Sequence, residues 1–158
     1  MDGLNNNYRR VCRIVTVKEI ILNQSQLDML TEHAIKSGQN ESCAMLLGIQ
    51  KEEQWNVKEI FLTQNVDGNP EVEFTISPEE LLTGYKHAEE KHLELIGIFH
   101  SHPKSIALPS STDQKFMGLN GDVPWIIFSG LTTDFKAFIL EEDVEEIKIR
   151  IVERHFFQ

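Results

Sequence analysis

The sequence predicts an α/β protein that folds as one domain over residues 1–158. The chain has the length of a single globular domain with room for a proper core. Strand patterns and helix patterns follow one another along it. The run SCAMLLGI, residues 42–49, is apolar without interruption and of strand length, which predicts a strand buried on both faces. Since no repeat, low-complexity tract or linker divides the sequence, we expect a single domain.

The first half of the chain adds a strand, a helix and a second strand around that buried run. The β-branched stretch at residues 11–22 predicts a strand. Residues 25–38 predict a helix, with Ser25 as the N-cap and Gly38 as its end. Apolar and polar side chains alternate more regularly over residues 54–66, which predicts a half-exposed neighbour of the buried strand.

A second helix is predicted after a turn and a short extended segment at residues 72–76. It spans residues 77–93, and its start carries several signals at once. Ser77 is the expected N-cap, and Pro78 occupies the first helical position. Glu80 is expected to complete a capping box with the serine.

The remaining third of the chain predicts a strand, a short helix and three closing strands. The predicted ranges, in that order, are residues 94–99, 111–121, 124–130, 135–140 and 145–153. The short helix ends in glycine, as helices often do.

Charge and hydropathy exclude several classes of partner. The net charge of −10 argues against nucleic acid or an anionic membrane surface as the main partner, because both need clustered Lys and Arg. No segment approaches the roughly 18 consecutive apolar residues of a membrane span, and the N-terminal stretch has no apolar core of signal-peptide length. We therefore expect a cytoplasmic protein, and a neutral or cationic partner suits it better.

The two cysteines give little information about function. Cys12 and Cys43 lie in apolar surroundings and form no C-x-x-C pair. They predict two reduced, half-buried thiols and neither a disulfide nor a cysteine metal site.

The stretch GIFHSHPKSIALPSSTD, residues 97–113, carries the strongest functional signal. Side chains alternate along a strand, so His100 and His102 project to the same side with Cα atoms roughly 6.6 Å apart. One metal ion could bind both imidazoles. Asp113, at the start of the next helix, is the natural third ligand. Zinc accepts neutral imidazole and carboxylate, and catalytic zinc sites keep three protein ligands and an open fourth position.

Each fragment of this pattern also has a simpler explanation. An isolated H-x-H is more often a surface or hydrogen-bonded pair than a metal site. The spacing from Ser110 to Asp113 is also that of a helix capping box. The complete pattern, His-x-His-Pro, six residues and then Ser-x-x-Asp, is long and constrained, and chance rarely produces it.

The stretch HSHPKSIALPSSTD resembles the motif of the JAMM (MPN-plus) zinc metalloproteases, whose members include deubiquitinating enzymes. The family also has an upstream glutamate beside a buried strand, and NESCAMLLG matches it with Glu41. The similarity covers most of the chain. It implies the MPN (cytidine-deaminase-like) fold, in which a mixed, curved β-sheet is flanked by helices.

The resemblance also implies a role for each matched residue. His100, His102 and Asp113 would hold zinc. Glu41 would be the general base that takes a proton from the zinc-activated water and delivers it to the leaving amine. Ser110 would donate a hydrogen bond to the oxyanion of the tetrahedral intermediate, a role that can coexist with capping.

Three functions are compatible with the sequence. The favoured one is a zinc isopeptidase that cuts after the C-terminal Gly-Gly of a ubiquitin-like protein, free or in conjugates. The alternative is a JAMM peptidase that processes a sulfur-carrier protein or a small peptide. A non-catalytic MPN scaffold is least favoured, because such proteins typically lose motif residues and this chain retains all of them. The short chain resembles compact prokaryotic members, and a homo-oligomer is compatible with it.

Overall fold

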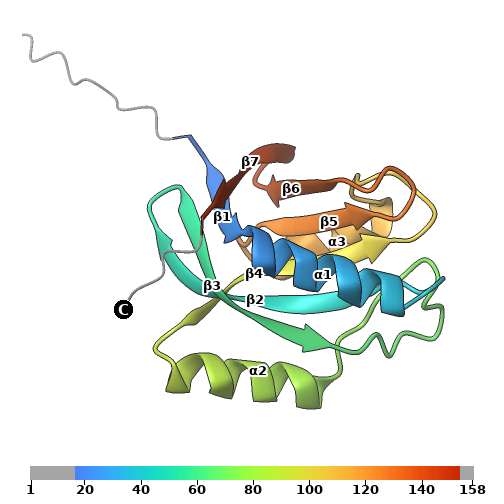
Figure 1. Ribbon diagram of the computed structural model, residues 1–158, viewed down its shortest axis with the longest axis horizontal. Coiled ribbons are helices and arrows are strands. Elements are labelled where there is room, and N and C mark those ends of the chain that lie inside the picture. The colour runs from blue at the N-terminus through green and yellow to red at the C-terminus, as the bar shows by residue number, and fades with distance from the viewer. Residues whose placement is uncertain (1–16, 154–158) are drawn as a thin grey trace, which may run out of the picture.

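The computed structural model describes residues 17–153, which form a curved sheet with helices on both of its faces (Figure 1). The elements follow in the order β1 (Glu19–Asn23), α1 (Gln24–Lys36), β2 (Cys43–Lys51), β3 (Gln54–Thr63), α2 (Pro78–Glu90), β4 (Glu94–His102), α3 (Ser111–Leu119), β5 (Trp125–Ser129), β6 (Phe135–Leu140) and β7 (Val144–Val152). The predicted α/β class is confirmed.

The strands form one mixed sheet in the spatial order β1-β3-β2-β4-β5-β6-β7. Strand β1 runs parallel to both β3 and β7, and β4 runs parallel to β5. The other neighbouring pairs are antiparallel. The pairing of β7 with β1 closes the sheet into a barrel. The sheet is therefore curved, as predicted, and its curvature is strong enough to close it.

Strand β2 is buried on both faces from Cys43 to Gly48, as its continuous apolar run predicts, but Ile49, the last residue of that run, is exposed. Ala44 and Leu46 pack in the cluster that contains Leu30 of α1. Met45 and Leu47 point to the opposite face and pack in the cluster beneath α2. Figure 1 shows α1 lying across the sheet and α2 alongside β2 and β3. Burial on both faces gives the strand that follows Glu41 a rigid position.

Helix α1 begins earlier than predicted. Its N-cap is Asn23, whose side chain accepts a hydrogen bond from the Gln26 N–H at 2.8 Å. The Gln26 side chain accepts one from the Asn23 N–H in return at 2.9 Å, which makes a capping box. The prediction of Ser25 as the N-cap is therefore wrong, because asparagine caps as well as serine and only Asn23 has a glutamine three residues later. The helix ends before Gly38, which has a φ of 60°, as predicted.

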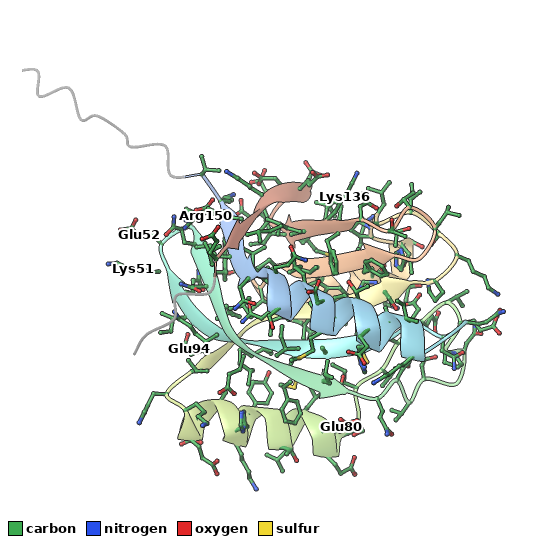
Figure 2. All side chains as sticks on the ribbon, in the orientation of Figure 1. Lys51, Glu52, Glu80, Glu94, Lys136 and Arg150 are labelled. Carbon is green, nitrogen blue, oxygen red and sulfur yellow. The ribbon has the colours of Figure 1, made fainter. Side chains whose placement is uncertain are left out.

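Helix α2 begins as predicted, with Ser77 as the N-cap and Pro78 in its first turn. The predicted capping box is wrong. The Glu80 carboxylate accepts a hydrogen bond at 2.9 Å from the backbone N–H of Gln64, beyond the end of β3. Figure 2 shows Glu80 at this end of the helix. Glu80 thus ties α2 to the neighbouring strand, a tertiary contact that its local spacing does not predict.

Several element ends also differ from the prediction. Strand β3 ends at Thr63 and does not reach residue 66. Strand β1 begins at Glu19, and residues 11–16 of its predicted range lie outside the described part of the chain. The segment 72–76 runs beside the barrel without joining the sheet.

Cys43 is completely buried, so the prediction of a half-buried thiol is wrong for this residue. It is a free cysteine, as predicted, whereas Cys12 lies outside the described residues. Between residues 17 and 153, no helix combines the length and the apolar character that crossing a membrane requires.

Candidate metal centre

His100 and His102 lie at the end of β4, where both imidazoles face the same side of the strand. Their Nε2 atoms are 3.0 Å apart, and both side chains are buried. Strand β4 is hydrogen-bonded to β2 on one edge and to β5 on the other. Because both edges are paired, the backbone that carries the two rings has little freedom to move.

Asp113 in the first turn of α3 brings a carboxylate to the same point. Its Oδ2 atom lies 3.1 Å from Nε2 of His100 and 3.1 Å from Nε2 of His102. The start of the helix orients this side chain. The Ser110 N–H donates to Oδ2 at 2.9 Å, and the Asp113 N–H donates to Ser110 Oγ at 3.0 Å. The predicted capping box is confirmed, and it aims Asp113 at the two histidines.

The protonation states of these side chains suit a metal site. Burial lowers the pKa of His100, so this ring is neutral near pH 7. For Asp113, burial opposes ionisation, but hydrogen bonds with His100 and His102 outweigh it and hold the pKa below its usual range. A neutral imidazole and a carboxylate are the forms in which these residues bind metal ions.

The ring orientation of His102 is set by the loop that follows β4. Nδ1 of His102 lies 2.9 Å from the carbonyl oxygen of Ile106. Because a carbonyl only accepts hydrogen bonds, Nδ1 carries a proton, and Nε2 is the ring nitrogen that faces His100 and Asp113. Metal-binding histidines commonly hold their tautomer through such a contact.

The three atoms form a triangle whose sides are 3.0, 3.1 and 3.1 Å. Two ligands of a tetrahedral zinc ion lie roughly 3.3 Å apart when each bond is about 2.0–2.1 Å. The side chains therefore need only a small outward movement to bind such an ion. Geometry, tautomer and charge all fit a divalent cation that accepts nitrogen and oxygen ligands.

Glu41 lies beside this triangle, two residues before β2. One ligand atom from each of Glu41, His100, His102 and Asp113 falls within 4.8 Å of the other three. The Glu41 side chain is buried, with 4% of the residue exposed, and its Oε1 atom has no hydrogen-bond partner among the described residues. Burial raises the pKa of Glu41 to about 8. An unpaired buried carboxyl with this pKa is suited to exchanging a proton near neutral pH.

The structure thus brings four of the five predicted site residues into one cluster, and Ser110 borders it through its hydrogen bonds with Asp113. Ser110 itself is exposed, at the rim of the cluster. Its hydroxyl accepts from the Asp113 N–H, which leaves the hydroxyl hydrogen free to donate.

Two aromatic residues form a wall of the site, and the sequence analysis did not identify either of them. The ring of Phe74 stacks on His100 with a centroid distance of 4.7 Å and an interplanar angle of 23°. Trp125 meets His100 edge-on, with a centroid distance of 5.5 Å. Neither residue belongs to the histidine motif, and no local signal identifies them. They restrict the His100 ring and exclude water from one side of it.

The same two rings border a cavity of about 300 Å³ between α2, β4 and α3. Its lining is mainly apolar and consists of Phe74, Thr75, Ile76, Leu81, Tyr85, Leu95, Ile98, Phe116, Asn120, Val123 and Trp125.

Ser101, between the two histidines, points to the opposite side of β4 and holds the segment after Glu41. Its Oγ accepts a hydrogen bond from the Ser42 N–H at 2.8 Å, and the two hydroxyls are 2.9 Å apart. The Ser101 N–H donates to the Ser42 carbonyl at 3.0 Å. This buried serine pair joins the chain at Glu41 to the strand that carries the histidines.

Comparisons with known proteins agree with the motif. The model of the Prok-JAB family, described as prokaryotic homologues of the JAB domain, matches residues 23–141. The chain is 35% identical to a desampylase of Pyrococcus furiosus over 117 residues, which are 73% of this chain and 79% of that protein. It is 31% identical over 119 residues to a probable TtuB-protein conjugate cleaving protease of Thermus thermophilus, covering 75% of this chain and 74% of the relative.

Solved structures show the same fold. The solution structure of protein DSY2949 from Desulfitobacterium hafniense superimposes with a TM-score of 0.77 at 27% identity, covering 85% of this chain and 94% of the other. A protein from Salinibacter ruber, at 20% identity, shares the fold with a TM-score of 0.64 over 88% of this chain and 94% of its own. The JAMM resemblance inferred from the motif is thus confirmed: the chain belongs to the Prok-JAB family of prokaryotic JAB-domain homologues and is a JAMM-type enzyme.

Proposed function

We propose that this protein is a zinc-dependent isopeptidase that hydrolyses the bond after the C-terminal Gly-Gly of a ubiquitin-like modifier. The observation that carries the proposal is the triangle of His100, His102 and Asp113 beside the buried, unpaired carboxyl of Glu41. The names of the relatives support the substrate class, since one is a desampylase and another is a probable TtuB-protein conjugate cleaving protease.

His100, His102 and Asp113 would hold the zinc ion through Nε2, Nε2 and a carboxylate oxygen. Zinc, when bound, supplies a Lewis acid that brings the pKa of a coordinated water molecule down to roughly 7. His100 and Asp113 are already in the protonation states that bind a metal ion. Burial opposes the charge of His102, but hydrogen bonds with Asp113 and the Ile106 carbonyl raise its pKa, so zinc binding would displace a proton from this ring. The Ile106 carbonyl keeps His102 in the tautomer that binding requires.

Glu41 would act as the general base and then as the general acid. Its carboxylate accepts a proton from the attacking water and delivers it to the nitrogen of the departing amine. Within residues 17–153, Oε1 has no hydrogen-bond partner, which supports this role because a carboxylate held in an ion pair would be a weaker base. As a general base, Glu41 would therefore lie beside the metal ion and would not be one of its ligands.

Ser110 would stabilise the negative charge that develops on the carbonyl oxygen of the substrate. The capping box holds its hydroxyl next to Asp113, and the hydroxyl hydrogen remains available to donate. Loss of one such donor typically costs on the order of 3 kcal/mol of transition-state stabilisation.

Cleavage of defined conjugates tests the function. The protein is incubated with Gly-Gly-terminated ubiquitin-like modifiers joined to a lysine side chain or to a linear peptide, with and without a chelator. We expect zinc-dependent cleavage of the isopeptide conjugate and severe slowing when the tail glycines are replaced by valine, because only glycine lets the backbone approach the site closely. Cleavage of the linear peptide alone would favour the peptidase alternative.

Glu41→Gln separates an enzyme from a scaffold. The substitution preserves shape but removes the basic carboxylate, so we expect kcat to fall by roughly 10²–10⁴-fold with little change in KM. Zinc content, measured by elemental analysis, should stay at about one ion per chain. Wild-type turnover by the variant would disprove the role of Glu41, and a zinc-loaded wild type that cleaves none of the conjugates would favour the scaffold.

A further inference from the structure

We propose that Asn65, which follows the end of β3, is a positioning residue that fixes the backbone of Glu41 and the aromatic wall of the site together. This inference rests on the proposed function, because it assigns Asn65 a role through the general base. The side-chain hydrogen bonds of Asn65 within the described residues go to none of the three proposed zinc ligands, and Asn65 is no part of the histidine motif.

The amide nitrogen of Asn65 lies within hydrogen-bond distance of three backbone carbonyls. It is 3.0 Å from the carbonyl oxygen of Glu41, 2.9 Å from that of Glu73 and 3.3 Å from that of Pro70. The two amide hydrogens can satisfy all three only by sharing, so the donor side of this carboxamide is fully used.

The oxygen of the same carboxamide organises the loop from the other side. Oδ1 of Asn65 accepts hydrogen bonds from the N–H of Asp67 at 3.0 Å and from the N–H of Thr75 at 3.1 Å. An amide oxygen has two lone pairs, and both are occupied. One side chain thus connects the two ends of the loop to each other and to Glu41.

Glu41 needs such an external support because it lies outside the strand ladder. Pairing of β2 with both of its neighbours begins at Cys43. At Glu41 the N–H donates to the Pro70 carbonyl at 2.8 Å, and the carbonyl accepts from Asn65. Pro70 is itself held by Asn65, so both backbone groups of Glu41 depend on this amide.

The same amide also places Phe74. The Glu73 carbonyl and the Thr75 N–H, on either side of Phe74, both bond to Asn65. Phe74 in turn stacks on His100. Asn65 therefore sets the position of the general base relative to the ring against which His100 packs.

Asn65→Asp tests the inference, with Asn69→Asp as the matched control. Aspartate keeps the shape and an acceptor for the loop, but it puts a second acceptor oxygen opposite the three carbonyls. Asn69 is exposed in the same loop, and its side chain takes no part in these contacts. We expect kcat of Asn65→Asp to fall roughly 10–100-fold with KM nearly unchanged, since small misplacements of a catalytic group have effects of this order. Zinc content should stay at about one per chain, and Asn69→Asp should retain wild-type kinetics.

A double variant distinguishes failure of the inference from failure of the proposed function. If Asn65 acts through Glu41, Asn65→Asp should cause no further loss of kcat in the Glu41→Gln background. The role of Asn65 would be overturned if the losses of kcat in the two single variants added up fully in the double variant, or if Asn65→Asp alone were as active as Asn69→Asp. The proposed function would then still stand. Wild-type activity of Glu41→Gln would instead disprove the role of Glu41 and, with it, the inference, whereas a zinc-loaded wild type that cleaves none of the conjugates would remove the proposed function.

A measurement on the wild-type protein covers the case in which Asn65 variants do not fold. Because the Asn65 amide hydrogens are shared among three carbonyls, they should exchange with solvent at least about tenfold more slowly than those of Asn69 in NMR spectra of the ¹⁵N-labelled, zinc-free protein. Equal exchange rates for the two side-chain amides would contradict the hydrogen-bond arrangement and, with it, the inference.

Discussion

At the scale of single residues, burial determines the chemistry of this site. His100, His102 and Asp113 are buried together and compensate one another through hydrogen bonds. Glu41 is buried, and its Oε1 has no hydrogen-bond partner among the described residues, so burial outweighs the attraction of His102 and disfavours its charge in the metal-free protein. Folded proteins retain such a group at a cost in stability, which is typical of catalytic residues.

The cost of burying Glu41 should appear in the pH dependence of stability. Its pKa is about 8 in the folded protein, against an ordinary value of 4.5. Below the ordinary value the carboxyl is protonated in both states and has no effect. As the pH rises from about 4.5 to 8, the unfolded chain releases the proton while the folded one keeps it, so the free energy of unfolding falls.

We therefore expect Glu41→Gln to stabilise the metal-free protein increasingly over this pH range. The gain over the wild type should reach on the order of a few kcal/mol near pH 8 and vanish near pH 4. Urea unfolding with a chelator at several pH values measures it. Glu90→Gln, an exposed change of the same kind on α2, should track the wild type. A constant difference between Glu41→Gln and wild type across the range would refute the prediction.

At the scale of elements, close backbone approach decides where the barrel needs glycine. In β2, a Cβ atom at Gly48 would lie 2.0 Å from the carbonyl oxygen of Asn56 in β3. The register between these strands shifts at Leu47 and Gly48. In α3, by contrast, a Cβ atom at Gly118 would meet only Leu140 at an ordinary 3.6 Å. Glycine is thus required in the strand but not in the helix.

Alanine at the two positions should have opposite effects on stability. Gly48→Ala forces the β2 and β3 backbones apart, and we expect a loss of about 1–3 kcal/mol in the free energy of unfolding. Gly118→Ala fits its helix and should add about 0.5–1 kcal/mol. Thermal and urea unfolding of the zinc-free proteins compare them directly. A Gly48→Ala protein as stable as Gly118→Ala would show that the strands can separate without cost.

At the scale of the whole molecule, the candidate site joins segments that are far apart in the sequence. Glu41 precedes β2, the histidines end β4, and Asp113 begins α3. An ion bound by β4 and α3 links the barrel to a helix on its outer face. Metal binding should therefore stabilise the folded protein as a unit, because the unfolded chain cannot hold these ligands together.

Zinc should raise the unfolding temperature of the wild type in a concentration-dependent way. At a free concentration of 100 times Kd, the expected gain in the free energy of unfolding is about 2.7 kcal/mol. His102→Ala should abolish most of this shift because it removes a ligand. His92→Asn, at an exposed residue with a φ of 56°, should keep the full shift, since asparagine tolerates this conformation. Equal shifts in both variants would place the zinc elsewhere.

Local rules account for the part of the site that the sequence determined by itself. The alternation of a strand places His100 and His102 on one face, and a Ser-x-x-Asp helix start orients Asp113. These geometries extend over a few residues of backbone, so they can be predicted from spacing alone. The fold class and the two-sided burial of β2 are predictable for the same reason, because they follow from hydrophobic periodicity.

The tertiary structure decided everything that depends on the register between distant segments. Glu41 was assigned through the resemblance to a family and not from spacing, and its contact with the histidines requires Ser42 to lie opposite Ser101, 59 residues further along the chain. Phe74 and Asn65 reach the site through a loop outside the sheet. The Glu80 side chain accepts a hydrogen bond from a backbone N–H beyond β3 and does not form the expected capping box. Such pairings depend on how the whole core packs, and no short stretch of sequence contains that information.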